Sequence, residues 1–277
     1  HDTFLRVFSL MDPSCFQEAF YSWVSSVNEE LLGKDIIRID GKTLRGSLDR
    51  ANKRSAIHMV NAWSSNTSLV LGQMKSEGKK NEIKTIPKLL DFLNIKNCIV
   101  SIDAMGYQKK IAAKIIDKGA DYVLAVKGNH EYLHNRVINI FEEERKKGRK
   151  KFNVEKCGFK TEGHGRIEKR KYTLISEKEN GALGLNILNQ WPQLNSVVKV
   201  PTERLIKKTG EVTEESRYFI CNLKTGVDEI SKVIRGHWEI ENNMHWILDV
   251  AFREDECRKR SGNTAENFSI VRHLALN

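Results

Sequence analysis

The chain has 277 residues, of which 40% are hydrophobic and 30% are charged, and its formal net charge is +10. No apolar run approaches the roughly 20 residues that a membrane-spanning helix needs, so we expect no membrane partner. A large positive charge favours acidic partners, and nucleic acid is the commonest of these. A basic protein without any nucleic-acid partner has the same composition, so charge alone does not decide the function.

The cysteines exclude one class of site. Five are scattered along the chain without any Cys-x-x-Cys pair, so we expect no structural zinc site. Free thiols fit a reducing cytoplasm. The chain begins at His1 rather than Met and ends in an apolar pattern without a helix stop signal, which suggests a fragment or processed product of a longer protein.

The first 128 residues predict helices followed by a sheet. Apolar residues recur at helical steps through residues 1–34, with a break at Asp12-Pro13, which predicts two short helices. Strands are predicted at 36–40, 57–63, 68–72, 98–102 and 122–126. One helix that Asn81 caps and another that stops near Gly119 separate the later strands. Three consecutive strands suit an antiparallel meander, and the helices suit crossovers to parallel strands.

This order predicts an α/β fold of the ribonuclease-H-like type, with a mixed five-stranded sheet flanked by helices. Residues 35–128 would form the first part of that core. Residues 129–225 would form a β-rich insertion, which opens with an amphipathic helix ending in the basic run 145–151 and continues with alternating stretches at 166–175, 196–206 and 212–223. Thr209-Gly210 is expected to turn a hairpin between the last two stretches.

Residues 226–277 are expected to complete the core. A helix from about Asp228 to Asp249 would place one apolar stripe on a single face, because its members step by three or four residues: Ile230, Ile234, Trp238, Glu241, His245 and Leu248. Glu241 would then lie against the sheet, where a metal ligand is more natural than a solvated glutamate.

Three acids predict a metal-dependent site. Asp40 and Asp103 each end an apolar strand, and Glu241 lies on the last helix. A carboxylate among apolar neighbours is costly unless a cation or hydrogen bonds compensate it. Mg²⁺ prefers oxygen ligands, and two such ions about 4 Å apart can activate an attacking oxygen and stabilise a leaving one. On a basic chain, the three acids predict Mg²⁺-dependent chemistry on nucleic acid.

Each acid also has an ordinary structural explanation. Asp40 precedes Gly41 and could begin a turn, Asp103 could cap the helix that follows it, and Glu241 could pair with Lys or Arg inside the fold. We favour a joint site for the three acids. Otherwise all of them would lie by coincidence on the two strands and the helix where the ribonuclease-H-like fold carries its catalytic acids. Glu239 is the alternative third acid.

Basic residues near the acids are candidate DNA contacts. Lys42 and Arg45 follow Asp40, Lys127 ends the predicted fifth strand, and Arg235 precedes Glu241 by six residues. Each could contact a phosphate, although a solvated surface charge is the ordinary alternative. The same two explanations apply to the basic run 145–151.

At these residues the chain resembles the H-repeat-associated insertion-sequence transposases, a group of DDE transposases often found near Rhs elements. The likeness covers nearly the whole chain. It is carried by the stretches His1 to Phe8, Ile39 to Ser47, Ser101 to Gln108, Tyr122 to Asn129, His164 to Glu168, Arg235 to Asn242 and His245 to Val250.

The resemblance implies a ribonuclease-H-like core with a β-strand insertion between the second aspartate and the glutamate. It implies Mg²⁺-dependent cleavage of double-stranded DNA at element ends, with Mn²⁺ able to substitute, and strand transfer into target DNA. Asp40, Asp103 and Glu241 would be its catalytic, metal-binding triad. It also implies a bacterial cytoplasmic protein that joins the nucleoid when bound to DNA and acts as a homodimer.

One departure from related insertion-sequence transposases concerns the last helix, where they carry Tyr, Arg, Glu and Lys at set spacings. Here Ile234, His237 and Leu248 stand at the Tyr, Arg and Lys positions. His237 is therefore the candidate DNA contact at the arginine position, and Arg235 could substitute from nearby.

Two other functions stay open from the sequence. The chain could be a truncated, non-catalytic DNA-binding remnant, which would bind DNA with strong salt dependence but not cut it. It could also be a ribonuclease-H-like nuclease that cleaves without strand transfer.

Overall fold

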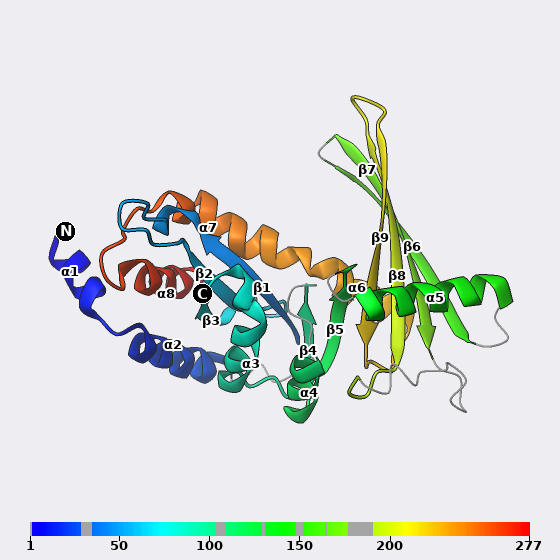
Figure 1. The fold of residues 1–277 in the computed structure, drawn as a ribbon, viewed down its shortest axis with the longest axis horizontal. Coiled ribbons are helices and arrows are strands. Elements are labelled where there is room, and N and C mark those ends of the chain that lie inside the picture. The colour runs from blue at the N-terminus through cyan, green and yellow to red at the C-terminus, as the bar shows by residue number, and fades with distance from the viewer. Residues whose placement is uncertain are drawn as a thin grey trace. The chain divides into compact units, whose positions relative to one another are not determined.

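The structure, a computed structural model, describes residues 2–28, 35–103, 109–128, 131–147, 152–163, 165–176 and 191–277 (Figure 1). The chain divides into two compact units. Unit 1 is His1–Ala120 with Gly236–Asn277, and unit 2 is Asp121–Arg235. The expected division after residues 34, 128 and 225 stays a prediction.

Unit 1 holds a mixed sheet with its described strands in the order β3-β2-β1-β4. The strands are β1 (Ile36–Leu44), β2 (Ile57–Ser64), β3 (Val70–Ser76) and β4 (Ile99–Ile102). β1 pairs antiparallel with β2 and parallel with β4, and β2 pairs antiparallel with β3. The predicted meander and the parallel return of the fourth strand are therefore confirmed.

Helices that are far apart in the chain pack on the sheet of unit 1 or on one another. These are α1 (Asp2–Leu10), α2 (Pro13–Asn28), α3 (Glu82–Phe92), α4 (Lys109–Asp117) and α8 (Thr264–Leu276). α3 packs on β2 and β3, while α2 and α8 pack on β3 and on each other (Figure 1). The ring of Tyr21 on α2 stacks on that of Phe92 on α3, with centroids 4.9 Å apart. The two ends of the chain thus help to bury the same sheet.

One face of β1 is apolar, and the other face carries the buried guanidinium of Arg38, which is 2% exposed. Ile37 and Ile39 of β1 are each 1% exposed, and Leu89 and Leu90 of α3 are fully buried. Side chains of a strand alternate between its two faces, so Ile37 and Ile39 lie on the apolar face, while Arg38 and Asp40 lie on the other. β1 is longer than predicted, because it continues past Asp40 and Gly41 to Leu44.

The last helix differs from its prediction, which was one continuous helix from 228 to 249. α6 (Val227–Gly236) ends in a turn at His237, and a π-helix, η6 (Ile240–His245), leads into α7 (Trp246–Val250). The backbone N–H of Trp246 accordingly donates to the carbonyl of Glu241, five residues earlier. The guanidinium of Arg38 fills the space beside Gly236, where an added Cβ would lie 2.1 Å from Nη2.

Unit 2 is built on an antiparallel sheet in the order β5-β9-β8-β7-β6. Its elements are β5 (Asp121–Val126), α5 (Glu131–Lys147), β6 (Asn153–Gly163), β7 (Arg166–Ser176), β8 (Ser196–Ile206) and β9 (Val212–Cys221). α5 packs on β9. The β-rich character of this segment and its opening helix are confirmed, and β5, expected as a fifth core strand, is counted with unit 2.

Two features of unit 2, a hairpin turn and the strand β6, can be compared with the predictions made from the sequence. The predicted hairpin turn at Thr209-Gly210 is present: Gly210 has φ +72°, and the N–H of Ile206 donates to the carbonyl of Glu211 at 2.9 Å. β6 was not predicted, because few of its side chains are apolar and none is fully buried. Residues 148–151 of the basic run lie outside the described residues. None of the described helices has the length and hydropathy that crossing a bilayer requires.

Candidate active site

The strand register brings Asp40 and Asp103 together. β1 and β4 run parallel with Arg38 opposite Ser101 and Ile39 opposite Ile102. One further step along both strands puts Asp40 beside Asp103, and neighbouring strands lie about 4.8 Å apart. Asp40 lies inside β1, opposite Asn61 of β2, so the alternative that it begins a turn is wrong. Whether Asp103 caps a helix depends on residues 104–108, which lie outside the described residues.

Asp40 is surrounded by negative charge. Its pKa is raised to about 7, chiefly by burial. A hydrogen bond from the N–H of Gly41 opposes this shift, while the charges of Asp103, Glu241 and Glu82 add to it. Since like charges this close disfavour ionisation, a cation at this position would relieve their repulsion.

The structure places Glu241 on the first turn of the π-helix, close enough to act on Asp40. Its side chain is nevertheless exposed, so the expected apolar stripe through Glu241 is wrong. Ile240, Met244 and Leu248 are fully buried instead, because the turn at His237 and the wider π-helix shift the phase of the helical faces. Within the described chain Glu241 has no ion-pair partner, which contradicts the alternative that it pairs with Lys or Arg.

Glu239, the alternative third acid, is engaged elsewhere. Its carboxylate accepts a hydrogen bond from Nη2 of Arg38 at 2.9 Å. The Arg38 side chain is only 2% exposed, so removal of Glu239 would leave a buried guanidinium without this counter-charge. Glu239 therefore has a structural role that Glu241 does not have.

A buried pair next to Gly41, the neighbour of Asp40, was not predicted from the sequence. Glu82 begins α3, and its Oε1 lies 2.5 Å from Nε2 of His58 on β2. Nδ1 of the same ring hydrogen-bonds to the hydroxyl of Thr43 at 2.8 Å. This pair packs closely against Gly41, where an added Cβ would lie 2.3 Å from Oε1 of Glu82. The glycine next to Asp40 could have signalled such a close approach.

Two histidines of the last helical segment contact the strands β1 and β4. Nδ1 of His245 lies 3.7 Å from Oδ2 of Asp40, and Nδ1 of His237 hydrogen-bonds to the hydroxyl of Ser101 on β4 at 3.0 Å. The pKa of His245 is lowered to about 3, first by burial and then by the positive charges of Lys42 and His237. His245 is therefore neutral near pH 7.

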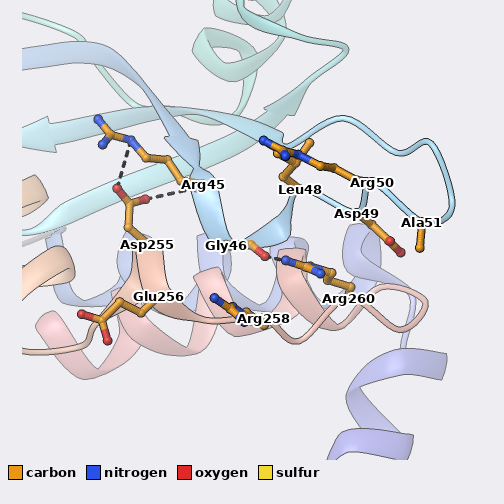
Figure 2. A pocket seen from close by; sticks show the side chains of 10 residues that line it. All are labelled: Arg45, Gly46, Leu48, Asp49, Arg50, Ala51, Asp255, Glu256, Arg258 and Arg260. Carbon is orange, nitrogen blue, oxygen red and sulfur yellow. Dashed lines mark hydrogen bonds and ion pairs between the residues drawn. The ribbon is translucent and has the colours of Figure 1, made fainter.

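Arg45 is exposed at the end of β1. It begins the 3₁₀ turn η2 (Arg45–Ser47), and 82% of its side chain is accessible to solvent. Its Nε lies 3.3 Å from Oδ2 of Asp255, and it lines a cavity of about 790 Å³ (Figure 2). Of the two basic candidates that follow Asp40, Arg45 is the one open to a ligand.

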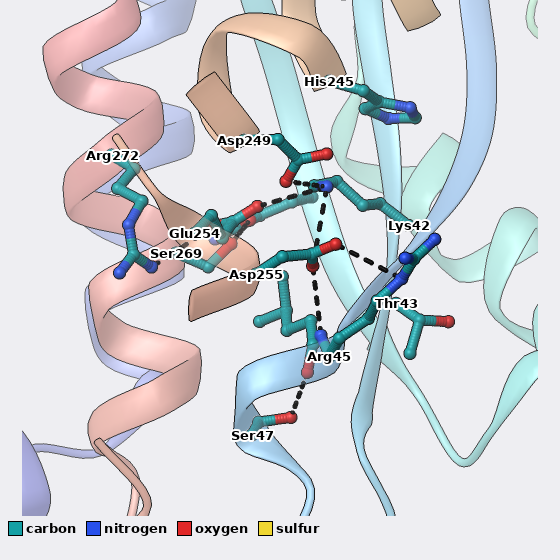
Figure 3. A network of polar contacts seen from close by, with 12 residues as sticks. Lys42, Thr43, Arg45, Ser47, His245, Asp249, Glu254, Asp255, Ser269 and Arg272 are labelled. Atoms are coloured by element: carbon teal, nitrogen blue, oxygen red, sulfur yellow. Dashed lines mark hydrogen bonds and ion pairs between the residues drawn. The ribbon is translucent and has the colours of Figure 1, made fainter. Parts of the chain in front are cut away.

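Lys42, by contrast, is 8% exposed and lies among carboxylates (Figure 3). Its ammonium nitrogen is 2.6 Å from Asp249 of α7, 3.9 Å from Asp255 and 4.0 Å from Glu254. Glu254 begins the 3₁₀ turn η7 (Glu254–Glu256) and also lies 3.4 Å from Arg272 of α8. Lys42 thus joins β1 to the segment that follows the π-helix.

The remaining basic candidates belong to unit 2. Lys127 follows β5 and is exposed. Arg235 lies in the last turn of α6, also exposed, with its guanidinium 5.7 Å from the ring centroid of Phe159.

The donor set suits a hard divalent cation. It offers carboxylate oxygens, and beside Asp40 the buried Oδ1 of Asn61 has no hydrogen-bond partner among the described residues. In that part of the chain, however, no three His, Cys, Asp or Glu side chains are gathered closely enough to hold a metal ion. The residue types and their repulsion fit Mg²⁺, while the side chains are not arranged as an assembled metal site.

The chain is similar to known proteins over its whole length. A family model described as "Transposase DDE domain" matches residues 31–277. "Putative protein YbfL" of Escherichia coli (strain K12) is 40% identical over 284 residues, covering 100% of this chain and 72% of the relative. "H repeat-associated putative transposase YhhI" of the same strain is 39% identical with the same coverage. The matched range contains all three acids.

Proposed function

We propose, from the premise that this chain belongs to the family of transposase DDE domains and to its H repeat-associated members, that it is the catalytic core of an insertion-sequence transposase. In this function it cleaves DNA at the ends of the element and joins the freed ends to target DNA. Its fold would be ribonuclease-H-like, with the strands of unit 1 at its centre and β5 as the fifth strand.

The proposed catalytic triad is Asp40, Asp103 and Glu241. The observation that carries it is the raised pKa of Asp40, to which the charges of both other acids contribute. The parallel register of β1 and β4 supports the pairing of the two aspartates. The engagement of Glu239 by Arg38 supports Glu241 as the third acid.

The triad would hold Mg²⁺, with Mn²⁺ able to substitute. When bound, such an ion activates the attacking oxygen and stabilises the leaving oxygen of a phosphodiester. Asp40 and Asp103 provide donors on adjacent strands, which keep their spacing rigid. Glu241 provides the third from a π-helix, an element often found at functional sites. His245, being neutral, adds no positive charge that would compete with the cation.

We also propose that double-stranded DNA is the partner and that a homodimer holds paired ends. Arg45, Lys127, Arg235 and His237 would contact phosphates, a role that the exposure of Arg45, Lys127 and Arg235 supports. Lys42 would act closer to the triad, through the carboxylates that surround it.

The test is Asp103→Asn in a plasmid-nicking and strand-transfer assay with Mn²⁺. We expect both activities to be lost while DNA binding and circular dichroism are unchanged. Cleavage that survives in the variant contradicts the triad. A wild-type chain that binds DNA but never cuts it favours the non-catalytic DNA-binding alternative, and one that cuts without joined products favours a simple nuclease.

A further inference from the structure

Two segments of unit 1 form an arginine-lined cavity whose lining does not include the proposed triad. One segment is η2 with the loop after it, and the other is η7 with the residues that follow it. The cavity has a volume of about 790 Å³ and is lined by Arg45, Gly46, Leu48, Asp49, Arg50, Ala51, Asp255, Glu256, Arg258 and Arg260 (Figure 2). Four of these side chains are guanidinium groups.

A glycine lets the two segments approach closely. A Cβ added at Gly46 would lie 2.3 Å from the carbonyl oxygen of Cys257 and 2.8 Å from that of Asp255. Nε of Arg260 donates to the carbonyl of Gly46 at 2.9 Å, and the N–H of Arg45 donates to Asp255 at 3.1 Å. The relative positions of the arginines are therefore held by backbone contacts as well as by side chains.

The second segment alternates its basic side chains. Arg258 and Arg260 line the cavity, while the ammonium of Lys259 between them lies 4.2 Å from the ring centroid of Phe268. Successive side chains of an extended segment point in opposite directions, so the run places both arginines on one side.

The acids of the cavity are already paired. Asp49 accepts a hydrogen bond from the amide of Asn52 at 2.7 Å and is acted on by the positive charges of Arg260 and Arg54, and Glu256 lies 2.6 Å from Arg253. Asp255 interacts with Arg45 and Lys42. In contrast, Arg50 and Arg258 are exposed and have no ion-pair partner among the described residues. The positive charge left over is thus concentrated on guanidinium groups that face the cavity.

From these contacts we infer that the cavity binds the sugar-phosphate backbone of double-stranded DNA, with Arg50 and Arg258 as its main phosphate contacts. This inference rests on the proposed function for the identity of the partner. Guanidinium groups bind phosphate oxygens in a bidentate manner. Arg45 lies five residues after Asp40, at most about 17 Å along the strand, which corresponds to about 5 base pairs of duplex at 3.4 Å each. A duplex bound in this cavity can therefore extend to Asp40, so that one short stretch of DNA contacts both the cavity and the proposed triad.

The test compares three double variants by binding to a short labelled duplex in EDTA, where no cleavage occurs. Arg50→Ala with Arg258→Ala removes the two proposed contacts. Arg6→Ala with Lys84→Ala removes the same charge from exposed positions on α1 and α3 of unit 1 and is the matched control. We expect the first variant to lose affinity on the order of tenfold, and its plot of log affinity against log salt to become shallower by about 2. The control should change neither value. Arg50→Lys with Arg258→Lys should restore the salt slope but only part of the affinity, because an ammonium keeps the charge and cannot bind phosphate in a bidentate manner.

Three outcomes overturn the inference. The first is an unchanged salt slope in the Arg50 and Arg258 variant, and the second is an equal loss in the control. The third is competition by inorganic phosphate beyond its effect on ionic strength, which would make the cavity a small-anion site. Because binding is measured without metal, these outcomes do not depend on catalysis. Absence of cleavage by the wild-type chain in Mn²⁺ would instead contradict the proposed function.

Discussion

Asp40 lies in surroundings that disfavour the ionised form of its carboxylate. Burial and the carboxylates of Asp103, Glu241 and Glu82 raise its pKa to about 7. A group in this situation lowers the stability of the metal-free protein whenever it is ionised. Gly41 beside it has its own constraint, because Glu82 and His58 occupy the space of a side chain. A substitution of Asp40 therefore tests the proposed triad, whereas a substitution of Gly41 tests its close packing against Glu82 and His58.

The third acid can be identified by comparing Glu241→Gln with Glu239→Gln. A ligand of the metal should be worth at least about a hundredfold in rate, since even second-layer residues are worth tenfold to a hundredfold. We expect Glu241→Gln to reduce plasmid nicking in Mn²⁺ by at least that factor with little effect on the melting temperature. Glu239→Gln should mainly lower the melting temperature, because Arg38 is buried. The reverse pattern would assign the triad to Glu239.

The close approach at Gly41 can be tested by Gly41→Ala. The added methyl group would lie 2.3 Å from Glu82 and 2.6 Å from His58, so we expect a loss of about 1–3 kcal/mol in the free energy of unfolding. Urea denaturation measures this loss. In the background of Glu82→Ala the same substitution should cost less, since the colliding carboxylate is absent. Equal costs in both backgrounds would show that Glu82 is not the cause.

Among the elements, the last helical segment is the one whose geometry departs most from a regular helix. It combines a turn at His237, the π-helix η6 and the short α7. Lys42 of β1 contacts Asp249 of α7 and lies within 4.0 Å of Glu254 and Asp255 beyond it (Figure 3). These contacts fasten the segment that carries Glu241 to the strand that carries Asp40.

Lys42→Met should therefore destabilise the protein. It removes the ammonium that compensates Glu254, which is 1% exposed on its side chain, and leaves Arg272 as its remaining basic partner at 3.4 Å. Removing one member of a buried ion pair costs about 3 kcal/mol or more, and urea denaturation at pH 7 measures it. Asp249→Asn is the control and should cost about 1 kcal/mol or less, because that side chain is 36% exposed. Similar values for both variants would contradict the role of Lys42 as the central charge.

For the whole molecule, net charge and buried histidines set the response to conditions. A formal charge of +10 makes binding to nucleic acid depend strongly on salt. His273 of α8 is 1% exposed, and its pKa is lowered to about 3, first by burial and then by the positive charges of His245, Arg272 and Lys42. The folded protein therefore keeps this ring neutral where an unfolded chain would protonate it.

The pH dependence of stability follows from that difference. Below the ordinary pKa of about 6.5, the unfolded chain binds a proton that folded His273 does not bind until about pH 3. The free energy of unfolding should thus fall by about 1.4 kcal/mol for each pH unit between about 6 and 4 from this residue. Urea denaturation of His273→Gln and the wild type over this range measures the contribution as the difference between their slopes. Asp40, whose pKa is raised, acts with the opposite sign, but it is common to both proteins. Parallel slopes would show that His273 titrates normally.

Much of the architecture was predictable because neighbours along the chain decide it. Alternating and apolar runs predicted β1 to β5, and the glycines at 119 and 210 marked a helix end and a hairpin, each with positive φ. β6 was missed since its side chains are mostly polar and only partly buried. The acids Asp40, Asp103 and Glu241 were singled out from local patterns alone, although their assignment as a triad is still a proposal.

What the sequence determined by itself was thus the order and type of most elements, the surplus of positive charge, and the family to which the motifs point. The tertiary structure alone decided which way each functional side chain faces. Glu241 is exposed because the turn at His237 and the π-helix shift the helical phase, and Lys42 contacts Asp249, which lies 207 residues further along the chain. The pair of His58 and Glu82 and the arginine cavity likewise join segments that are distant in sequence. Such contacts depend on how strands and helices pack, and no pattern of neighbouring residues contains that information.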